Sequence, residues 1–93
     1  MKRALIRSSA FIRAAKKLLR KNPTSLIDLK TALLSMEENI FNSSLKSHKL
    51  SGDLSGSWAC SASYNLRIIF SIVNSEGKEA ILLETIGTHD EVY

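Results

Sequence analysis

The sequence has very few of the residues from which disulfides and metal centres are built. Its 93 residues include one cysteine, Cys60, and two widely separated histidines, His48 and His89. A single cysteine excludes an intramolecular disulfide and a cysteine-built zinc site, and it is typical of proteins in a reducing cytosol. We therefore expect a cytoplasmic protein that needs neither a metal nor a cofactor.

Other absences narrow the function classes further. No apolar run approaches the roughly 20 residues needed to span a bilayer, so no membrane contact is expected. The four glycines form no P-loop or dinucleotide-binding motif, and no Ser-His-Asp or Cys-His arrangement has a supporting motif. Residues 1–21 are basic and contain no acid, as in an organellar transit peptide. Their removal, however, would delete a well-patterned strand and helix.

Acidic residues are scarce in the first third of the chain. Residues 1–30 carry nine Lys or Arg side chains and a single acid, Asp28, whereas residues 31–93 carry four basic and eight acidic side chains. This asymmetry indicates a polyanionic partner, or an acidic protein partner, on the N-terminal side. A solvated lysine face would produce the same pattern, and the pattern alone does not choose between them.

The N-terminal half predicts a strand and two helices in a single domain that spans residues 1–93. Residues 2–7 fit an edge strand, and Ser8 or Ser9 is placed to cap a helix that extends to Lys21. One side of that helix is apolar, and the other carries Arg13, Lys16, Lys17, Arg20 and Lys21. Asn22-Pro23-Thr24 ends the helix and starts a second one.

The second helix has an unusually wide apolar stripe. Apolar residues recur at three- and four-residue steps from Leu26 to Ile40, which indicates core packing. Ile27, Leu34 and Phe41 widen the stripe, and the extra width leaves room for contact with a partner.

From Trp58 onward the hydrophobic period changes to two, which predicts strands. Turns are expected at residues 63–65 and 74–77, and the last strand at residues 79–86. The predicted fold is α+β with element order β-α-α-β-β-β, a small antiparallel sheet with two helices packed on one face. In this pleat Trp58, Cys60 and Ile68 face the helices. Arg67 then faces away from them, where it would meet a ligand.

Four residues of the second half have the side chains that RNA cleavage without a metal requires. A base must remove the proton of a 2′-hydroxyl, a cation must stabilise the phosphorane, and an acid must protonate the leaving 5′-oxygen. Histidine suits the first and last roles and arginine suits the second, because its planar fork matches phosphate oxygens. The candidates are His48, Arg67, His89 and Tyr93, with Lys46 and Lys49 as a small phosphate-contacting cluster.

The order and spacing of these residues resemble the RelE/YafQ family of bacterial toxins over nearly the whole chain. The resemblance is most specific in residues 48–70 and 86–93. It implies a RelE-like β-α-α-β-β-β fold and a toxin that enters the 30S ribosomal A site. Such toxins cut mRNA there and leave a 2′,3′-cyclic phosphate and a 5′-hydroxyl. The resemblance also implies a cognate antitoxin protein as partner, with DNA contacted only indirectly through the antitoxin complex.

The resemblance assigns expected roles to individual residues. Arg67 falls where the family has its transition-state arginine, His89 on a C-terminal catalytic histidine, Tyr93 on an aromatic position, and His48 on the histidine before the glycine loop. The residues expected to contact RNA are Lys46, Lys49, Ser61, Asn65, Arg13, Lys17 and Arg20.

Two positions depart from the YafQ-like pattern. That branch has a histidine where this sequence has Ser61, and an aspartate where it has Asn65. Serine is no base at neutral pH, and asparagine carries no charge that could tune a neighbouring group. A second hypothesis is therefore a catalytically weak or inactive relative that binds RNA and antitoxin. A third is a small basic regulator that binds DNA directly, which the period of two in the C-terminal half disfavours.

Overall fold

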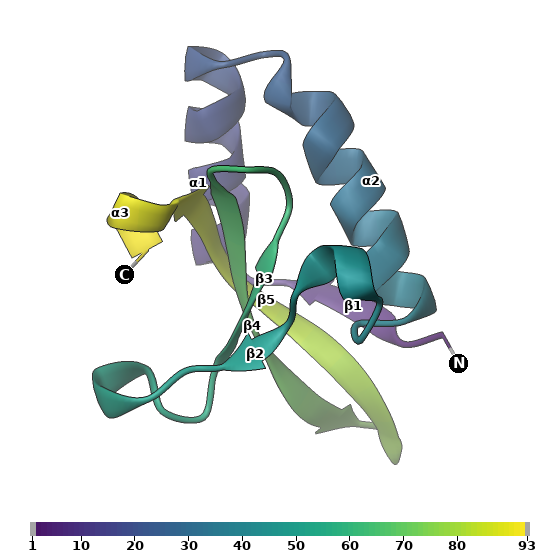
Figure 1. Cartoon of the computed structure of the whole chain (residues 1–93). Helices are drawn as coiled ribbons and strands as arrows, with labels where there is room; N and C mark the ends of the chain where they lie inside the picture. Colours follow the sequence, from purple (N-terminus) through teal and green to yellow (C-terminus); the bar gives the residue numbers. More distant parts are fainter. Residues whose placement is uncertain (1, 93) are drawn as a thin grey trace.

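The computed structural model describes residues 2–92 and arranges them as a five-stranded sheet with helices against it (Figure 1). The strands are β1 (Ala4–Arg7), β2 (His48–Lys49), β3 (Trp58–Ser61), β4 (Leu66–Ser75) and β5 (Lys78–Thr88). The helices are α1 (Ser9–Lys21), α2 (Ser25–Glu38) and the short α3 (His89–Val92). Two 3-10 turns, η1 (Ser43–Leu45) and η2 (Gly52–Leu54), flank β2. None of the described helices is long and apolar enough to cross a membrane.

The α+β prediction is confirmed, but the sheet is mixed and not wholly antiparallel. Its strand order is β1-β5-β4-β3-β2, and β1 pairs parallel to β5, with Ala4 opposite Ala80. The other three pairings are antiparallel. The direction of an edge strand depends on how the two intervening helices return the chain to the sheet, which periodicity does not record. The two-residue strand β2, which contains His48, was not predicted either.

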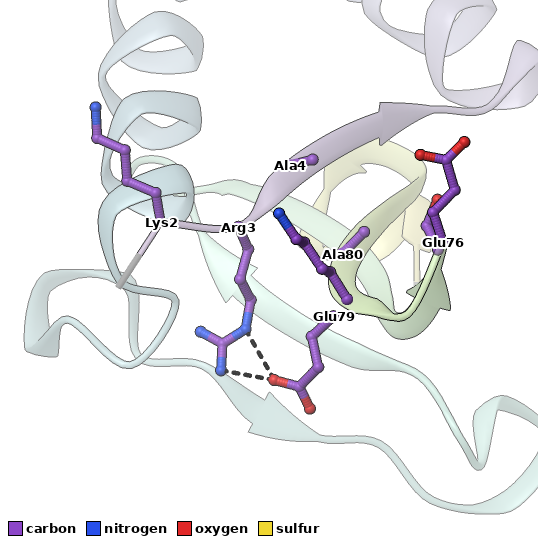
Figure 2. A pocket seen from close by; sticks show the side chains of 8 residues that line it. Lys2, Arg3, Ala4, Glu76, Glu79 and Ala80 are labelled. Atoms are coloured by element: carbon purple, nitrogen blue, oxygen red, sulfur yellow. Dashed lines mark hydrogen bonds and ion pairs between the residues drawn. The ribbon is translucent and has the colours of Figure 1, made fainter.

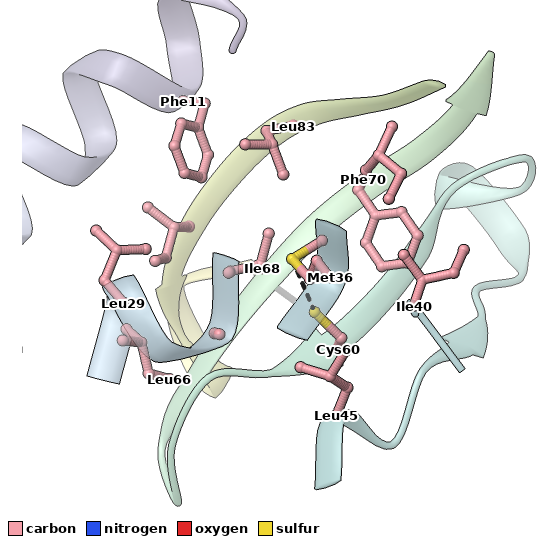
Figure 3. Close-up of a cluster of buried hydrophobic side chains, with 13 residues drawn as sticks. Phe11, Leu29, Met36, Ile40, Leu45, Cys60, Leu66, Ile68, Phe70 and Leu83 are labelled. Carbon is pink, nitrogen blue, oxygen red and sulfur yellow. Dashed lines mark hydrogen bonds between the residues drawn. The ribbon is translucent and has the colours of Figure 1, made fainter. Parts of the chain in front are cut away.

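Both long helices pack on one face of the sheet through a single apolar cluster (Figure 3). Of the two serines predicted as caps, Ser8 caps α1, because its Oγ accepts a hydrogen bond from the backbone N–H of Phe11 at 3.0 Å. Cys60 of β3 lies under α2, with its Sγ 3.7 Å from the Met36 Sδ. The cluster comprises Phe11, Leu29, Ala32, Met36, Ile40, Leu45, Cys60, Leu66, Ile68, Phe70, Ile81, Leu83 and Ile86. Leu66 and Ile68, on either side of Arg67 in β4, both belong to this cluster, so Arg67 lies on the other face, in agreement with the predicted pleat.

A β-bulge changes the alternation of β5 in its middle. Ile69 pairs with Thr85 and Phe70 pairs with Leu83, so Glu84 has no partner opposite it. The extra residue lets both Leu83 and Ile86 reach the core, although strict alternation would place them on opposite faces. The Glu84 carboxylate accepts a hydrogen bond from Ser57 Oγ at 2.8 Å, and this contact lies away from the helices.

The side chains that widen the stripe of α2 remain outside the core. Ile27 and Leu34 are 73% and 65% exposed, and Phe41, just beyond the helix, is 55% exposed. We call Ile27, Leu34 and Phe41 the α2 apolar stripe. Their exposure is consistent with the predicted room for a partner.

Candidate functional site

The face of the sheet away from the helices, here called the open face, brings three of the candidate residues close in register. Antiparallel pairing places Ser61 of β3 opposite Arg67 of β4, and His48 of β2 opposite Ala59 of β3. Ala59 and its partner Ile69, the neighbours of His48 across the sheet, are apolar and almost fully buried. Because alternate residues of a strand share a face, His48, Ser61 and Arg67 lie on this same side of the sheet.

Arg67 is held in place by the turn between β3 and β4. Its Nη1 donates to the carbonyl oxygens of Ser63 at 3.0 Å, Tyr64 at 3.1 Å and Leu66 at 3.2 Å. Within residues 2–92, neither Nη2 nor Nε of this arginine has a hydrogen-bond partner. One nitrogen therefore fixes the guanidinium, and two others are available to bind oxygen atoms of a ligand.

A hollow of about 330 Å³ lies beside this arginine. Its lining contains two cations, Lys46 and Arg67, and no acidic side chain. The complete lining is Ser44, Lys46, Ser61, Ala62, Ser63, Tyr64 and Arg67. Two cations and several hydroxyl groups around one small hollow fit a phosphate group. We call this region the Arg67 hollow.

His48 is oriented by the backbone of the same segment. Its Nδ1 lies 3.0 Å from the carbonyl oxygen of Lys46. A carbonyl only accepts hydrogen bonds, so this contact assigns the ring hydrogen to Nδ1. In the neutral ring Nε2 then carries the lone pair, as a general base requires.

His89 is brought to the same end of the sheet by the chain turn that follows β5. Its backbone N–H donates to the carbonyl oxygen of Asn65 at 3.2 Å, and its Nδ1 lies 3.6 Å from Asp90 Oδ1. The β3–β4 turn therefore contacts both Arg67 and His89. Figure 1 shows this turn and α3 near one another at one end of the sheet.

The short helix that begins at His89 is closed by reciprocal hydrogen bonds. The Thr88 N–H donates to Glu91 Oε1 at 2.8 Å, and the Glu91 N–H donates to Thr88 Oγ1 at 3.3 Å, as in a capping box. The hydrogen bonds from Thr88 lower the pKa of the Glu91 carboxyl. A Cβ at Gly87 would lie 3.1 Å from Glu91 Oε1, a tight contact that would require Glu91 to shift by a few tenths of an ångström.

Other predicted site residues lie elsewhere. Lys49 points to the opposite side from His48 and packs over the Trp58 ring, with its Nζ 5.6 Å from the ring centroid. The cluster predicted for Lys46 and Lys49 is therefore split between two faces, because β2 is a strand. Tyr93 lies outside the described residues. The basic side of α1 forms a separate hollow of about 550 Å³ lined by Arg13, Lys16, Lys17, Arg20 and Lys21.

A larger hollow, about 750 Å³, is shown in Figure 2. It is lined by residues where β4 ends and β5 begins, whereas Arg67 lies at the start of β4. Its lining contains both acidic and basic side chains, and its arginine is already paired, with Arg3 Nη2 3.0 Å from Glu79 Oε1. Because that ion pair satisfies the cation, this hollow suits an anionic ligand less well than the Arg67 hollow. In residues 2–92 no three His, Cys, Asp or Glu side chains gather closely enough to hold a metal ion.

Comparison with known proteins gives a match at the level of structure only. No protein-family model matches the chain, and no curated protein matches its sequence. YafQ from E. coli superposes with a TM-score of 0.78 at 18% identity, covering 99% of each chain. A YoeB/ParE toxin from Agrobacterium tumefaciens gives 0.74 at 14% identity, covering 92% of this chain and 98% of that one. YafQ in the E. coli DinJ–YafQ toxin–antitoxin complex gives 0.76 at 19% identity, covering 100% and 99%.

The chain has the fold of the RelE/YafQ toxins. The resemblance inferred from the sequence is thus confirmed for the fold, along nearly the full length of these toxin chains. At this level of identity the match does not carry the roles of individual residues from one chain to the other. The arrangement around Arg67 has to be judged on its own geometry.

Sequence reasoning gave no role to Tyr64 or Glu84. Tyr64 is 98% exposed and lines the Arg67 hollow, but the sequence pattern indicates it only as part of a turn. Glu84 is the unpaired residue of the bulge, which the alternating pattern does not reveal, and its carboxylate accepts a hydrogen bond from Ser57. Cys60, by contrast, has no reactive character, because burial raises the pKa of its thiol to about 12.

Proposed function

We propose that this protein is the toxin of a type II toxin–antitoxin pair and that it cleaves mRNA on the ribosome. The observation that carries the proposal is the Arg67 hollow, which joins two cations on the open face of a sheet with the YafQ fold. A pinned arginine with two available nitrogens is suited to a phosphate whose negative charge increases during reaction. The lack of acidic side chains in the lining leaves that attraction unopposed.

The proposed reaction uses two cations that line this hollow, Arg67 and Lys46, and two histidines outside its lining, His48 and His89. The scissile phosphate binds Arg67 through Nη2 and Nε, with Lys46 as a second cation. His48 Nε2 removes the proton of the neighbouring 2′-hydroxyl, and that oxygen attacks phosphorus. His89 in its protonated form donates a proton to the leaving 5′-oxygen. The products are a 2′,3′-cyclic phosphate and a 5′-hydroxyl, and the two histidines end with exchanged protonation states.

The two departures from the YafQ-like pattern are compatible with this scheme. Ser61 lines the hollow, where its hydroxyl can donate to a phosphate oxygen without acting as a base. Asn65 holds His89 through its backbone carbonyl, a contact that any residue at this position would make. In this scheme neither position has to supply the ionisable group found in YafQ-like proteins.

We also propose an antitoxin protein as partner. YafQ with DinJ and the Staphylococcus aureus YoeB with YefM have been solved as complexes, and each toxin chain has this fold. The α2 apolar stripe is an exposed surface on which such a partner could bury Ile27 and Leu34. The basic side of α1, with Arg13, Lys17 and Arg20, is proposed to contact ribosomal RNA.

The alternative is a weakly active relative that binds RNA and antitoxin. The two hypotheses differ in whether His48 and His89 transfer protons during cleavage. The test is mRNA cleavage in a reconstituted translation extract, with cut sites mapped by primer extension. Wild-type protein, Arg67→Ala and His89→Gln are compared, with Lys78→Gln at the far end of β5 as the matched control. In-frame cuts that disappear in the first two variants and persist in the control support the nuclease. Ribosome binding without any cuts favours the alternative.

A further inference from the structure

Tyr64 is the most exposed large side chain near the Arg67 hollow. It lies in the β3–β4 turn, is 98% exposed, and lines the hollow together with Lys46 and Arg67. Its carbonyl oxygen accepts a hydrogen bond from Arg67 Nη1 at 3.1 Å. The backbone that carries the tyrosine ring is therefore tied to the guanidinium.

We propose that Tyr64 is a stacking platform for an unpaired nucleobase of RNA whose phosphate binds Arg67 and Lys46. The inference rests on the proposed function and deepens it, since it adds a residue that positions the substrate strand. Proteins that bind single-stranded RNA place exposed aromatic rings beside cations, because the rings stack on bases while the cations bind the backbone. Tyr64 and the Arg67 hollow combine these two features within a few residues.

The surroundings of Tyr64 favour a nucleic acid over a protein partner. A ring that docks into a protein interface normally has other apolar side chains around it. Here the only apolar side chain in the lining besides the tyrosine is Ala62, and the rest are hydroxyl groups and cations. Stacking tolerates every base, so Tyr64 is expected to fix the position of a nucleotide and not its identity.

The test measures binding of RNA separately from its cleavage. A fluorescein-labelled, single-stranded oligoribonucleotide with 2′-deoxy substitutions that prevent cutting is titrated with the full chain, and anisotropy reports the dissociation constant. Tyr64→Ala is expected to raise Kd about 5- to 150-fold, the range for loss of one stacked base. Tyr64→Phe keeps the ring and should bind like wild type. Leu54→Ala, which removes partly exposed apolar surface on η2, is the matched control.

A second titration decides whether the loss comes from stacking. Abasic sites are introduced one at a time along the same oligonucleotide, and at one position the difference between wild type and Tyr64→Ala should disappear. Unchanged Kd for Tyr64→Ala, or equal losses on every abasic RNA, overturns the inference, as does a wild type that binds no RNA. Thermal unfolding of each variant confirms that the fold is retained.

The outcome is distinguishable from failure of the proposed function. If wild type binds the oligonucleotide through Tyr64 but makes no cuts in the translation extract, the stacking role holds and the nuclease assignment fails. The opposite result is that wild type cleaves mRNA and that Tyr64→Ala cleaves mRNA and binds RNA as well as wild type does. In that case the nuclease stands and the exposed tyrosine is assigned to another partner.

Discussion

Replacing Arg67 with lysine tests the site without removing its positive charge. Arg67 uses Nη1 to bind three carbonyl oxygens of the β3–β4 turn and keeps Nη2 and Nε available for a ligand. Lysine has one ammonium group, which can bind either the turn or a phosphate, but it cannot span both. Arg67→Lys should therefore lose either the ordered turn or the bidentate contact to phosphate.

The expected magnitudes separate these two consequences. Loss of a donor aimed at the developing charge typically lowers the rate of the chemical step about 100- to 1000-fold, or about 3 to 4 kcal/mol. Loss of the turn contacts costs much less, about 1 kcal/mol of unfolding free energy, because all three carbonyls share one partly exposed nitrogen. Arg67→Lys should therefore stay folded and still associate with the ribosome, while its single-turnover cleavage rate collapses.

The assay is single-turnover cleavage on ribosomes with a defined mRNA, together with urea unfolding of each variant. Arg7→Lys, a charge-conserving change at an exposed position of β1, is the control and should cut at the wild-type rate. Full activity in Arg67→Lys would refute the bidentate role. A rate loss matched by a large loss of stability would assign Arg67 to the turn alone.

Three further predictions concern the rest of the molecule. Replacing Arg13, Lys17 and Arg20 on the basic side of α1 with glutamine should weaken ribosome association. In salt titrations the slope of log K against log[salt] should fall in magnitude by about 0.7–0.9 per lost phosphate contact. An unchanged slope would assign that side of α1 to solvent. The Cys60 thiol should react with a disulfide reagent only as fast as the chain opens, and labelling at the rate of an exposed thiol contradicts its burial. Because its folded pKa is raised to about 12, its contribution to stability is present below pH 9 and lost as pH rises toward 12. Glu91→Gln should loosen α3, which would be measured as faster hydrogen exchange at the Thr88 N–H. Wild type should show the same loosening as pH falls through the lowered pKa of the Glu91 carboxyl. Equal exchange in the variant and in wild type at neutral pH would contradict a stabilising role of the capping box.

Several features could be predicted because their signals are local. Ser8 caps α1 as expected, since a cap needs only one hydroxyl a few residues from the first free N–H groups. The face on which Arg67 lies follows from its position between Leu66 and Ile68, which are both buried. The resemblance to the toxin family identified the fold that the comparison later confirmed. The proposed roles of the histidines remain predictions.

What failed depended on contacts between distant parts of the chain. The parallel pairing of β1 with β5 joins residues about as far apart as the sequence allows. The separation of Lys46 from Lys49 needed the knowledge that His48 belongs to a strand paired with β3. The bulge at Glu84 adds one residue to a pattern that otherwise looks regular. In each case the partner strand, and not the local pattern, decided the outcome.

The sequence by itself thus determined the class of the fold, the helix boundaries within a few residues, the charged side of α1 and the inward or outward direction of the β4 side chains. These follow from hydrophobic period, caps and charge, all of which operate over a few residues. Only the tertiary structure decided which groups meet. It tied one nitrogen of Arg67 to the turn, set the Nδ1 of His48 against a carbonyl, and placed Tyr64 beside two cations. Those contacts depend on strand register and turn geometry. The pattern of residues along the sequence does not record how far apart distant residues lie in the folded chain.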